Sequence, residues 1–122
     1  MHATILFGHG SRDPAWRVPI DSVANHMRKI NPQSCVRCAF LELTEPDLAS
    51  VMAELAAKHV KHVTIVPMFL GVGRHAREDL PLLVSELRQT YPKVHFVLRP
   101  SVGEEPRVIE MLARLSLPDG LA

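Results

Sequence analysis

Apolar and polar positions alternate in blocks along the chain, and these blocks predict four strands that are each followed by a helix. Four short apolar runs, at residues 3–8, 35–41, 62–69 and 94–98, have the length of buried strands. Between them, apolar residues recur every three or four positions, as on the buried side of an amphipathic helix. These helical positions are Ile20, Val23, Ala24, Met27 and Ile30; Leu48, Val51, Met52 and Leu55; Leu80, Leu83, Val84 and Leu87; and Val108, Met111, Leu112 and Leu115. All four helices are therefore expected to face the core.

Polar residues and prolines mark where the helices begin. Asp13-Pro14 resembles an N-cap followed by proline at the first helical position. Pro19 lies further along the same segment and predicts an irregular first turn. The stretch 44–47, Thr-Glu-Pro-Asp, has the form of a capping box for the second helix. Glu-Glu-Pro at 104–106 opens the fourth helix.

The spacing of the strands predicts their direction and order. They start near residues 3, 35, 62 and 94, and repeats of about 30 residues suit right-handed βαβ crossovers, which produce a parallel sheet. The strands are apolar on both sides, so helices should cover both faces. The expected fold is a single α/β domain over residues 1–122, a doubly wound parallel four-stranded sheet in the order 2-1-3-4. The end of the chain, residues 117–122, is expected to fray.

Composition narrows the functional classes. The chain has 122 residues, 47% of them hydrophobic and 22% charged, with a net charge of +1, so no nucleic-acid footprint is expected. No apolar run is long enough to span a membrane, and no signal peptide is evident. Two cysteines favour a reducing compartment, and we expect the cytoplasm. Cys35 and Cys38 are three apart on a strand and point to opposite faces, which predicts core residues and neither a disulfide nor a metal clip.

The polar residues at the carboxyl ends of the strands are the candidates for chemistry, because doubly wound sheets bind ligands there. His9, between two glycines, follows the first strand, Glu42 follows the second, and His75 lies in the loop after the third. In the order 2-1-3-4 these three side chains are expected to stand on one rim. An imidazole accepts a proton or binds a metal near neutral pH, and a carboxylate attracts cations.

Several of these residues also have simpler interpretations. His75 is spaced to pair with Asp79 at the start of the third helix, and Glu45 is placed where acids favour a helix start. Arg12 and Arg74 lie beside the two histidines. They are candidate anchors for substrate carboxylates through forked hydrogen bonds, with ordinary surface charge as the alternative.

The remaining histidines lie away from the candidate rim. His59 and His62 flank the turn into the third strand, at the opposite end of the sheet, where we expect them to be solvated. His2, His26 and His95 show no partner from their spacing.

The segments LFGHGSRDP, FLELTEPDL and VPMFLGVGRHAREDLP resemble the sirohydrochlorin chelatase family, specifically its short single-domain CbiX type. The resemblance implies a chelatase-like fold and a lyase that inserts a divalent metal into a sirohydrochlorin-type tetrapyrrole. Cobalt, for cobalamin synthesis, is the first expectation, with iron for siroheme or nickel as alternatives. No cofactor beyond this metal substrate is implied. Longer relatives carry two such domains, so the resemblance also implies a homodimer.

The same resemblance implies roles for individual residues. His9 would be the catalytic proton acceptor and a metal ligand, His75 the second metal ligand, and Glu42 the acidic site residue. The positions implied to contact the tetrapyrrole are Ser11, Arg12, Glu45, Leu70, Gly71, Val72, Gly73, Arg74 and His75.

Two alternative functions would use the same histidines in other roles. A carrier of metal or tetrapyrrole would bind without catalysing insertion. A phosphoryl-transfer enzyme would use His9 as nucleophile with Arg12 on the phosphate, but those sites usually place arginine immediately before the histidine, where this chain has Gly8. The dinucleotide-binding fingerprint is not met, because Asp13 stands where its third glycine should be.

Overall fold

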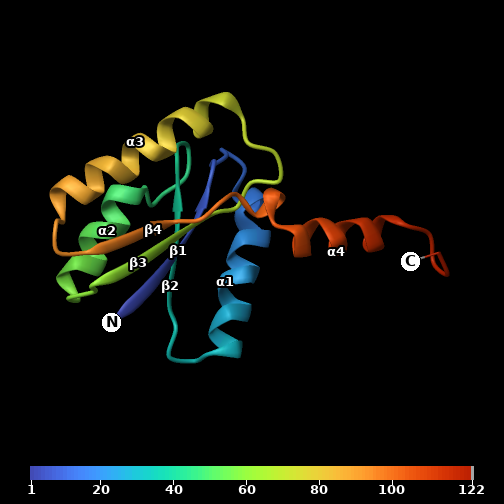
Figure 1. Ribbon diagram of the computed structural model, residues 1–122, viewed down its shortest axis with the longest axis horizontal. Helices are drawn as coiled ribbons and strands as arrows, with labels where there is room; N and C mark the ends of the chain where they lie inside the picture. The colour runs from blue at the N-terminus through green and yellow to red at the C-terminus, as the bar shows by residue number, and fades with distance from the viewer. Residues whose placement is uncertain (122) are drawn as a thin grey trace.

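The protein folds around one parallel sheet in the strand order β2-β1-β3-β4, as a computed structural model describes it for residues 1–121. The strands are β1 (His2–Gly8), β2 (Cys35–Phe40), β3 (His62–Pro67) and β4 (His95–Leu98). The helices are α1 (Val18–Ile30), α2 (Leu48–Ala57), α3 (Arg74–Thr90) and α4 (Pro106–Ser116), with short 3-10 turns η1 (Pro14–Arg17) and η2 (Val102–Glu104). The strand order, the parallel direction of the strands and the alternation of strands and helices confirm the fold predicted from the sequence (Figure 1).

Helices cover both faces of the sheet, also as predicted. Ala3, Ile5 and Phe7 of β1 pack into the larger core cluster with α2 and α3, whereas Leu6 packs with α1 on the other side. Figure 1 shows α2 and α3 on one side of the sheet and α1 on the other. A central strand buried on both faces must be apolar at successive positions, which is why β1 reads as an unbroken apolar run. Within residues 1–121, no helix combines the length and apolar character needed to cross a membrane.

The two cysteines lie on opposite faces, as their spacing predicts. Both thiols are free and half-buried, Cys35 against the larger core cluster and Cys38 against the α1 cluster. Burial, with Asp21 nearby, raises the pKa of the Cys38 thiol above its ordinary value, so the thiol stays protonated and unreactive.

The start of the first helix is irregular, in agreement with the prediction from its prolines. Asp13 accepts a hydrogen bond from the Ala15 amide and begins η1, and α1 follows with Pro19 in its first turn. Proline is tolerated there because first-turn amides have no helical partner. Ile20 and Ala24 of α1 are buried, whereas Val23 of the predicted apolar stripe is 39% exposed.

The capping box predicted for α2 is wrong. The helix is capped by Asp47 alone, whose carboxylate accepts a hydrogen bond from the Ser50 amide. Hydrogen bonding to the Ser50 side chain, and then to its amide, lowers the pKa of Asp47 below its ordinary value. Thr44 takes no part, because its hydroxyl is bonded to a loop far away in the sequence, described below.

The fourth helix does not face the core, contrary to the prediction. α4 has no buried residue, and Met111 and Leu115 on its apolar side are 58% and 73% exposed. Figure 1 shows α4 projecting away from the rest of the molecule. The sequence pattern correctly identified an amphipathic helix, but the surface that would cover it is not supplied by residues 1–121. Beyond the helix, the Leu121 amide donates to the Pro118 carbonyl in a turn; residue 122 of the predicted frayed end lies outside the described residues.

An ion pair ties β2 to α2. The Arg37 guanidinium donates to both carboxylate oxygens of Glu54 at 2.9 to 3.1 Å, and Lys58 lies 3.1 Å from the same carboxylate. Together they lower the pKa of Glu54 from 4.5 to about 2, with the Arg37 hydrogen bonds as the larger cause.

Glu54→Gln should lower the free energy of unfolding at pH 7 by up to about 1 kcal/mol, because partly exposed ion pairs contribute little. The folded-state pKa lies below the unfolded value, so the contribution is present above pH 4.5 and is lost as the pH falls to about 2. Denaturant unfolding at a series of pH values should show a constant difference between the two proteins above pH 4.5, which shrinks as the pH falls and vanishes near pH 2. An equal difference at every pH would contradict this assignment.

Candidate functional site

The segments that leave β1 and β2 continue side by side past the end of the sheet. The Leu41 amide donates to the Gly8 carbonyl, and the Glu42 amide donates to the His9 carbonyl, both at 3.0 Å. These two bonds extend the parallel pairing of the strands. They place the side chains of His9 and Glu42 next to each other, 33 positions apart in sequence.

His9 and Glu42 are in direct contact, as the predicted strand order requires. His9 Nε2 lies 2.9 Å from Glu42 Oε1. The side chains are 40% and 48% exposed, so the pair is accessible to a ligand. A carboxylate that accepts the Nε2 proton fixes the imidazole ring and leaves the Nδ1 lone pair free for a proton or a metal.

Close packing surrounds the glycines on either side of His9, and at Gly10 it requires glycine. A Cβ atom at Gly10 would lie 1.7 Å from the Glu42 carbonyl oxygen, and Gly10 has a positive φ of 105°. A Cβ atom at Gly8 would lie 2.7 Å from the Ile20 side chain. Glycine at both positions therefore lets the His9 segment touch the Glu42 segment and α1.

Thr44 and Ser11 lock the same two segments together. The Ser11 amide donates to Thr44 Oγ1 at 2.9 Å, and the Thr44 hydroxyl donates to the Ser11 carbonyl at 2.8 Å. The Ser11 hydroxyl in turn accepts from the Asp13 amide. Of the residues predicted to contact substrate here, Ser11 is thus engaged in holding its own loop, while Arg12 and Glu45 are exposed on either side.

The loop after β2 borders an open hollow of about 700 Å³, lined by Phe40, Leu41, Glu42, Leu43, Thr44, Glu45, Pro46, Asp47 and Ser50. Arg17 steadies this loop by donating to the Glu45 carbonyl at 3.0 Å, with its guanidinium 4.6 Å from the centre of the Phe40 ring. Leu43 has a positive φ of 63°, which is uncommon for a side chain of this size. Three carboxylates line the hollow, those of Glu42, Glu45 and the helix cap Asp47.

His75 lies in the first turn of α3, and its prediction as a loop residue is wrong. The helix begins at Arg74 after Gly73, which has no side chain to cap it, so the sequence carried no start signal. His75 Nε2 is 3.4 Å from Asp79 Oδ2, which confirms the local pairing. Arg74 pairs in the same way with Glu78, at 3.1 Å.

The structure therefore joins His9 to Glu42, and His75 to Asp79. Across residues 1–121, no three histidine, cysteine, aspartate or glutamate side chains converge so as to hold a metal ion. A cation shared by His9 and His75 stays a prediction. Both imidazoles are accessible, since the His75 side chain is 74% exposed.

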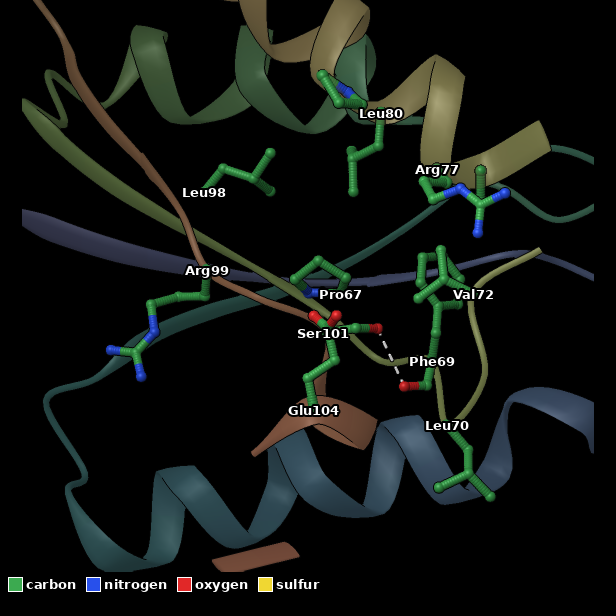
Figure 2. A pocket seen from close by; sticks show the side chains of 12 residues that line it. Pro67, Phe69, Leu70, Val72, Arg77, Leu80, Leu98, Arg99, Ser101 and Glu104 are labelled. Atoms are coloured by element: carbon green, nitrogen blue, oxygen red, sulfur yellow. Dashed lines mark hydrogen bonds between the residues drawn. The ribbon is translucent and has the colours of Figure 1, made fainter. Parts of the chain in front are cut away.

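A second cavity, of about 340 Å³, lies beyond the ends of β3 and β4 and under α3. Figure 2 shows Pro67, Leu80 and Leu98 facing it from three different elements. The Ser101 hydroxyl donates to the Phe69 carbonyl at 3.0 Å on its floor. The side of the cavity near the start of α3 is lined by Leu70, Val72 and Arg77.

The sequence patterns indicated Leu70, Val72 and Leu80 of this cavity, but not Gly103 or Pro81, which also shape it. A Cβ atom at Gly103 would lie 1.8 Å from the Leu70 carbonyl oxygen, and the Gly103 amide donates to the Phe69 carbonyl. η2 therefore packs directly against the start of the loop 70–73. Pro81 lies inside α3 and leaves the Arg77 carbonyl without its helical partner. Both residues are visible in the sequence, but the contact partner of Gly103 is 33 positions away.

Comparison with known proteins places the chain in a family. The family model described as CbiX matches residues 3–116. The chain belongs to the CbiX family. The CbiX protein of Marinobacter aquaeolei VT8, described as a putative cobalamin (vitamin B12) biosynthesis protein, has a solved structure with a TM-score of 0.81, 29% identity and coverage of 94% of this chain and 93% of that one.

Two further comparisons involve longer proteins. The sirohydrochlorin cobaltochelatase of Methanopyrus kandleri is 32% identical over 84 residues, which are 69% of this chain and 59% of the relative. The present chain therefore spans about three fifths of the length of this relative. SirB from Bacillus subtilis, solved with Fe³⁺, shares the fold with a TM-score of 0.77 and 21% identity, over 96% of this chain and 48% of SirB.

Gly10→Ala should lower the free energy of unfolding by more than about 1 kcal/mol, because alanine disfavours the positive φ and its Cβ collides with the Glu42 carbonyl. Gly73→Ala is the matched control, with a φ of −64° and nothing within 4 Å of its Cβ, and should change stability by less than about 0.5 kcal/mol. Denaturant unfolding compares the two. Equal effects would show that the close approach at Gly10 is not a constraint.

Proposed function

We propose that this CbiX-family chain is a sirohydrochlorin chelatase, a lyase that inserts a divalent metal into a sirohydrochlorin-type tetrapyrrole. The observation that carries the proposal is the contact between His9 Nε2 and Glu42 Oε1 at the exposed rim of the sheet. The family and the name of the Methanopyrus kandleri relative support the choice of reaction.

The His9–Glu42 pair suits the proton transfers that metal insertion requires. The tetrapyrrole must lose two pyrrole protons as the metal enters. With its Nε2 proton donated to Glu42, His9 presents the Nδ1 lone pair as the acceptor. The carboxylate stabilises the imidazolium that forms, and solvent removes the proton from the exposed pair.

His9 and His75 are the proposed ligands that deliver the metal; His9 Nδ1 holds the cation first and accepts a pyrrole proton once the cation has passed to the ring nitrogens. Neutral imidazole suits Co²⁺, Fe²⁺ and Ni²⁺ alike, so the donors do not select among them. We propose Co²⁺, with Fe²⁺ and Ni²⁺ as alternatives, and therefore a role in cobalamin or siroheme synthesis with no further cofactor. The exposed first turn of α3 holds His75 by a single contact to Asp79, which a metal can replace.

The tetrapyrrole is proposed to lie over the rim, between the loop 70–74 and the hollow beside Glu45. Leu70 is 71% exposed and offers an apolar contact to the macrocycle. Arg12 and Arg74 are exposed cations for its carboxylates. The cavity under α3 is too small for a whole tetrapyrrole and suits one of its side chains, with Arg77 at the wall.

His9→Ala and Glu42→Gln should each reduce the rate of metal insertion by about 100-fold or more, because each removes part of the proton acceptor. The rate is followed by the absorbance change of the tetrapyrrole with Co²⁺, Fe²⁺ and Ni²⁺ in turn. His26→Ala, an exposed histidine on α1, is the control and should be unaffected. Unchanged rates in both site variants would refute the mechanism. Tight metal binding by the wild type without insertion faster than the spontaneous reaction would identify a carrier instead.

A second copy of this chain is the proposed partner, and the apolar side of α4 is the proposed contact. Met111, Leu112 and Leu115 are exposed on a helix that leaves the body of the molecule. An apolar helical face of this kind normally packs against another surface. SirB, which has the same fold, is about twice as long, so two copies of this chain match its length.

Met111→Glu combined with Leu115→Glu should shift the solution mass from dimer to monomer, because charges would replace the apolar contact. Ile30→Glu is the matched control, since Ile30 is 74% exposed at the end of a different helix, and should leave the mass unchanged. Analytical ultracentrifugation provides the measurement. A monomeric wild type, or a dimer that survives both substitutions, would show that α4 is not the contact.

A further inference from the structure

Three histidines that are far apart in the sequence lie side by side across the sheet. In the parallel register, His2 of β1 is opposite His62 of β3, and His62 is opposite His95 of β4. The ring centres are 6.1 Å apart for the first pair and 5.9 Å for the second. Sequence spacing indicated no partner for His2 or His95, and the strand register places His62 between them.

All three side chains are on the α1 side of the sheet and are exposed. Alternation along β1 and β3 places Ile5 and Ile65 in the core under α2 and α3, and sends the histidines to the opposite face. Val97, two positions after His95 and on the same face, is 39% exposed, so no helix within residues 1–121 covers this part of the sheet. His2 Nε2 is hydrogen-bonded to Thr64 Oγ1 at 2.9 Å, which holds one end of the row.

We infer that His62 and His95, with His2 beside them, form a surface site for a divalent transition-metal cation. A metal–nitrogen bond is about 2.1 Å long, so two imidazoles on one cation have ring centres roughly 5 to 6.5 Å apart. The spacing of 5.9 Å between His62 and His95 lies within that range. Exposed side chains rotate freely enough to aim two nitrogens at one point, and water completes the coordination.

The donor type defines which metals the site takes. Neutral imidazole binds Co²⁺, Ni²⁺, Cu²⁺ and Zn²⁺, whereas Mg²⁺ and Ca²⁺ prefer carboxylate and carbonyl oxygens. Two protein donors give weaker binding than the three or four of a structural site. The site therefore exchanges its cation with solution and does not hold a permanent ion.

The row lies at the opposite end of β1 from His9. His9 is seven positions after His2, which corresponds to roughly 23 Å of extended chain. A cation at the histidine row and one at the rim are therefore distinct. The inference stands independently of the proposed chelatase activity, since it uses no residue of the His9–Glu42 pair.

Nickel titration followed by ¹H–¹⁵N spectra tests the site, in a His9→Ala/His75→Ala background so that the rim cannot contribute. Paramagnetic Ni²⁺ should broaden the amide signals of Thr64 and Phe96 first, because these residues adjoin the row. Adding His62→Gln and His95→Gln should raise the apparent Kd for Ni²⁺ at least tenfold. His26→Gln on α1 is the control and should leave it unchanged.

Thermal melting of each variant establishes that the fold is intact, which is expected because all the substituted histidines of the row are on the surface. An unchanged Kd in the His62→Gln/His95→Gln protein would overturn the inference. So would broadening centred on another part of the chain, or an equal response of the diamagnetic spectra to Mg²⁺ and Zn²⁺.

Discussion

Both ends of the molecule depend on the parallel backbone pairing of β1 with its two neighbours. Pairing with β2 continues beyond the strand through the Leu41 and Glu42 amides, which brings His9 and Glu42 into contact. Pairing with β3 fixes the register that sets His2 opposite His62. A slip of one residue in either ladder would turn side chains to the other face and remove the arrangement that depends on that ladder.

The sequence predicted the fold and part of the rim for identifiable physical reasons. Apolar runs at intervals of about 30 residues permit few topologies, because βαβ crossovers are right-handed and strands buried on both faces cannot alternate. The general rule that ligands bind at the carboxyl ends of strands then pairs His9 with Glu42 without any side-chain information. Predicting the contact between these two residues required only a correct strand order.

The rest depended on contacts that have no local signature. Thr44 looks like a helix cap, but its hydroxyl is taken by Ser11 through two hydrogen bonds. The start of α3 was missed because Gly73 lacks a capping side chain, and the histidine row needs strand register correct to one residue. The pattern of α4 shows that one face must be covered, but it does not contain the partner surface.

Two hydrogen bonds join the segments that follow β1 and β2, from the Leu41 amide to the Gly8 carbonyl and from the Glu42 amide to the His9 carbonyl. Both are made by backbone atoms. The frame is therefore indifferent to which side chains stand at positions 9 and 42, provided that glycine remains at position 10. Single side chains at these two positions can therefore be replaced while the backbone pairing stays intact. It offers a scaffold on which other acid–base pairs, or other metal donors, could be installed by design or by drift.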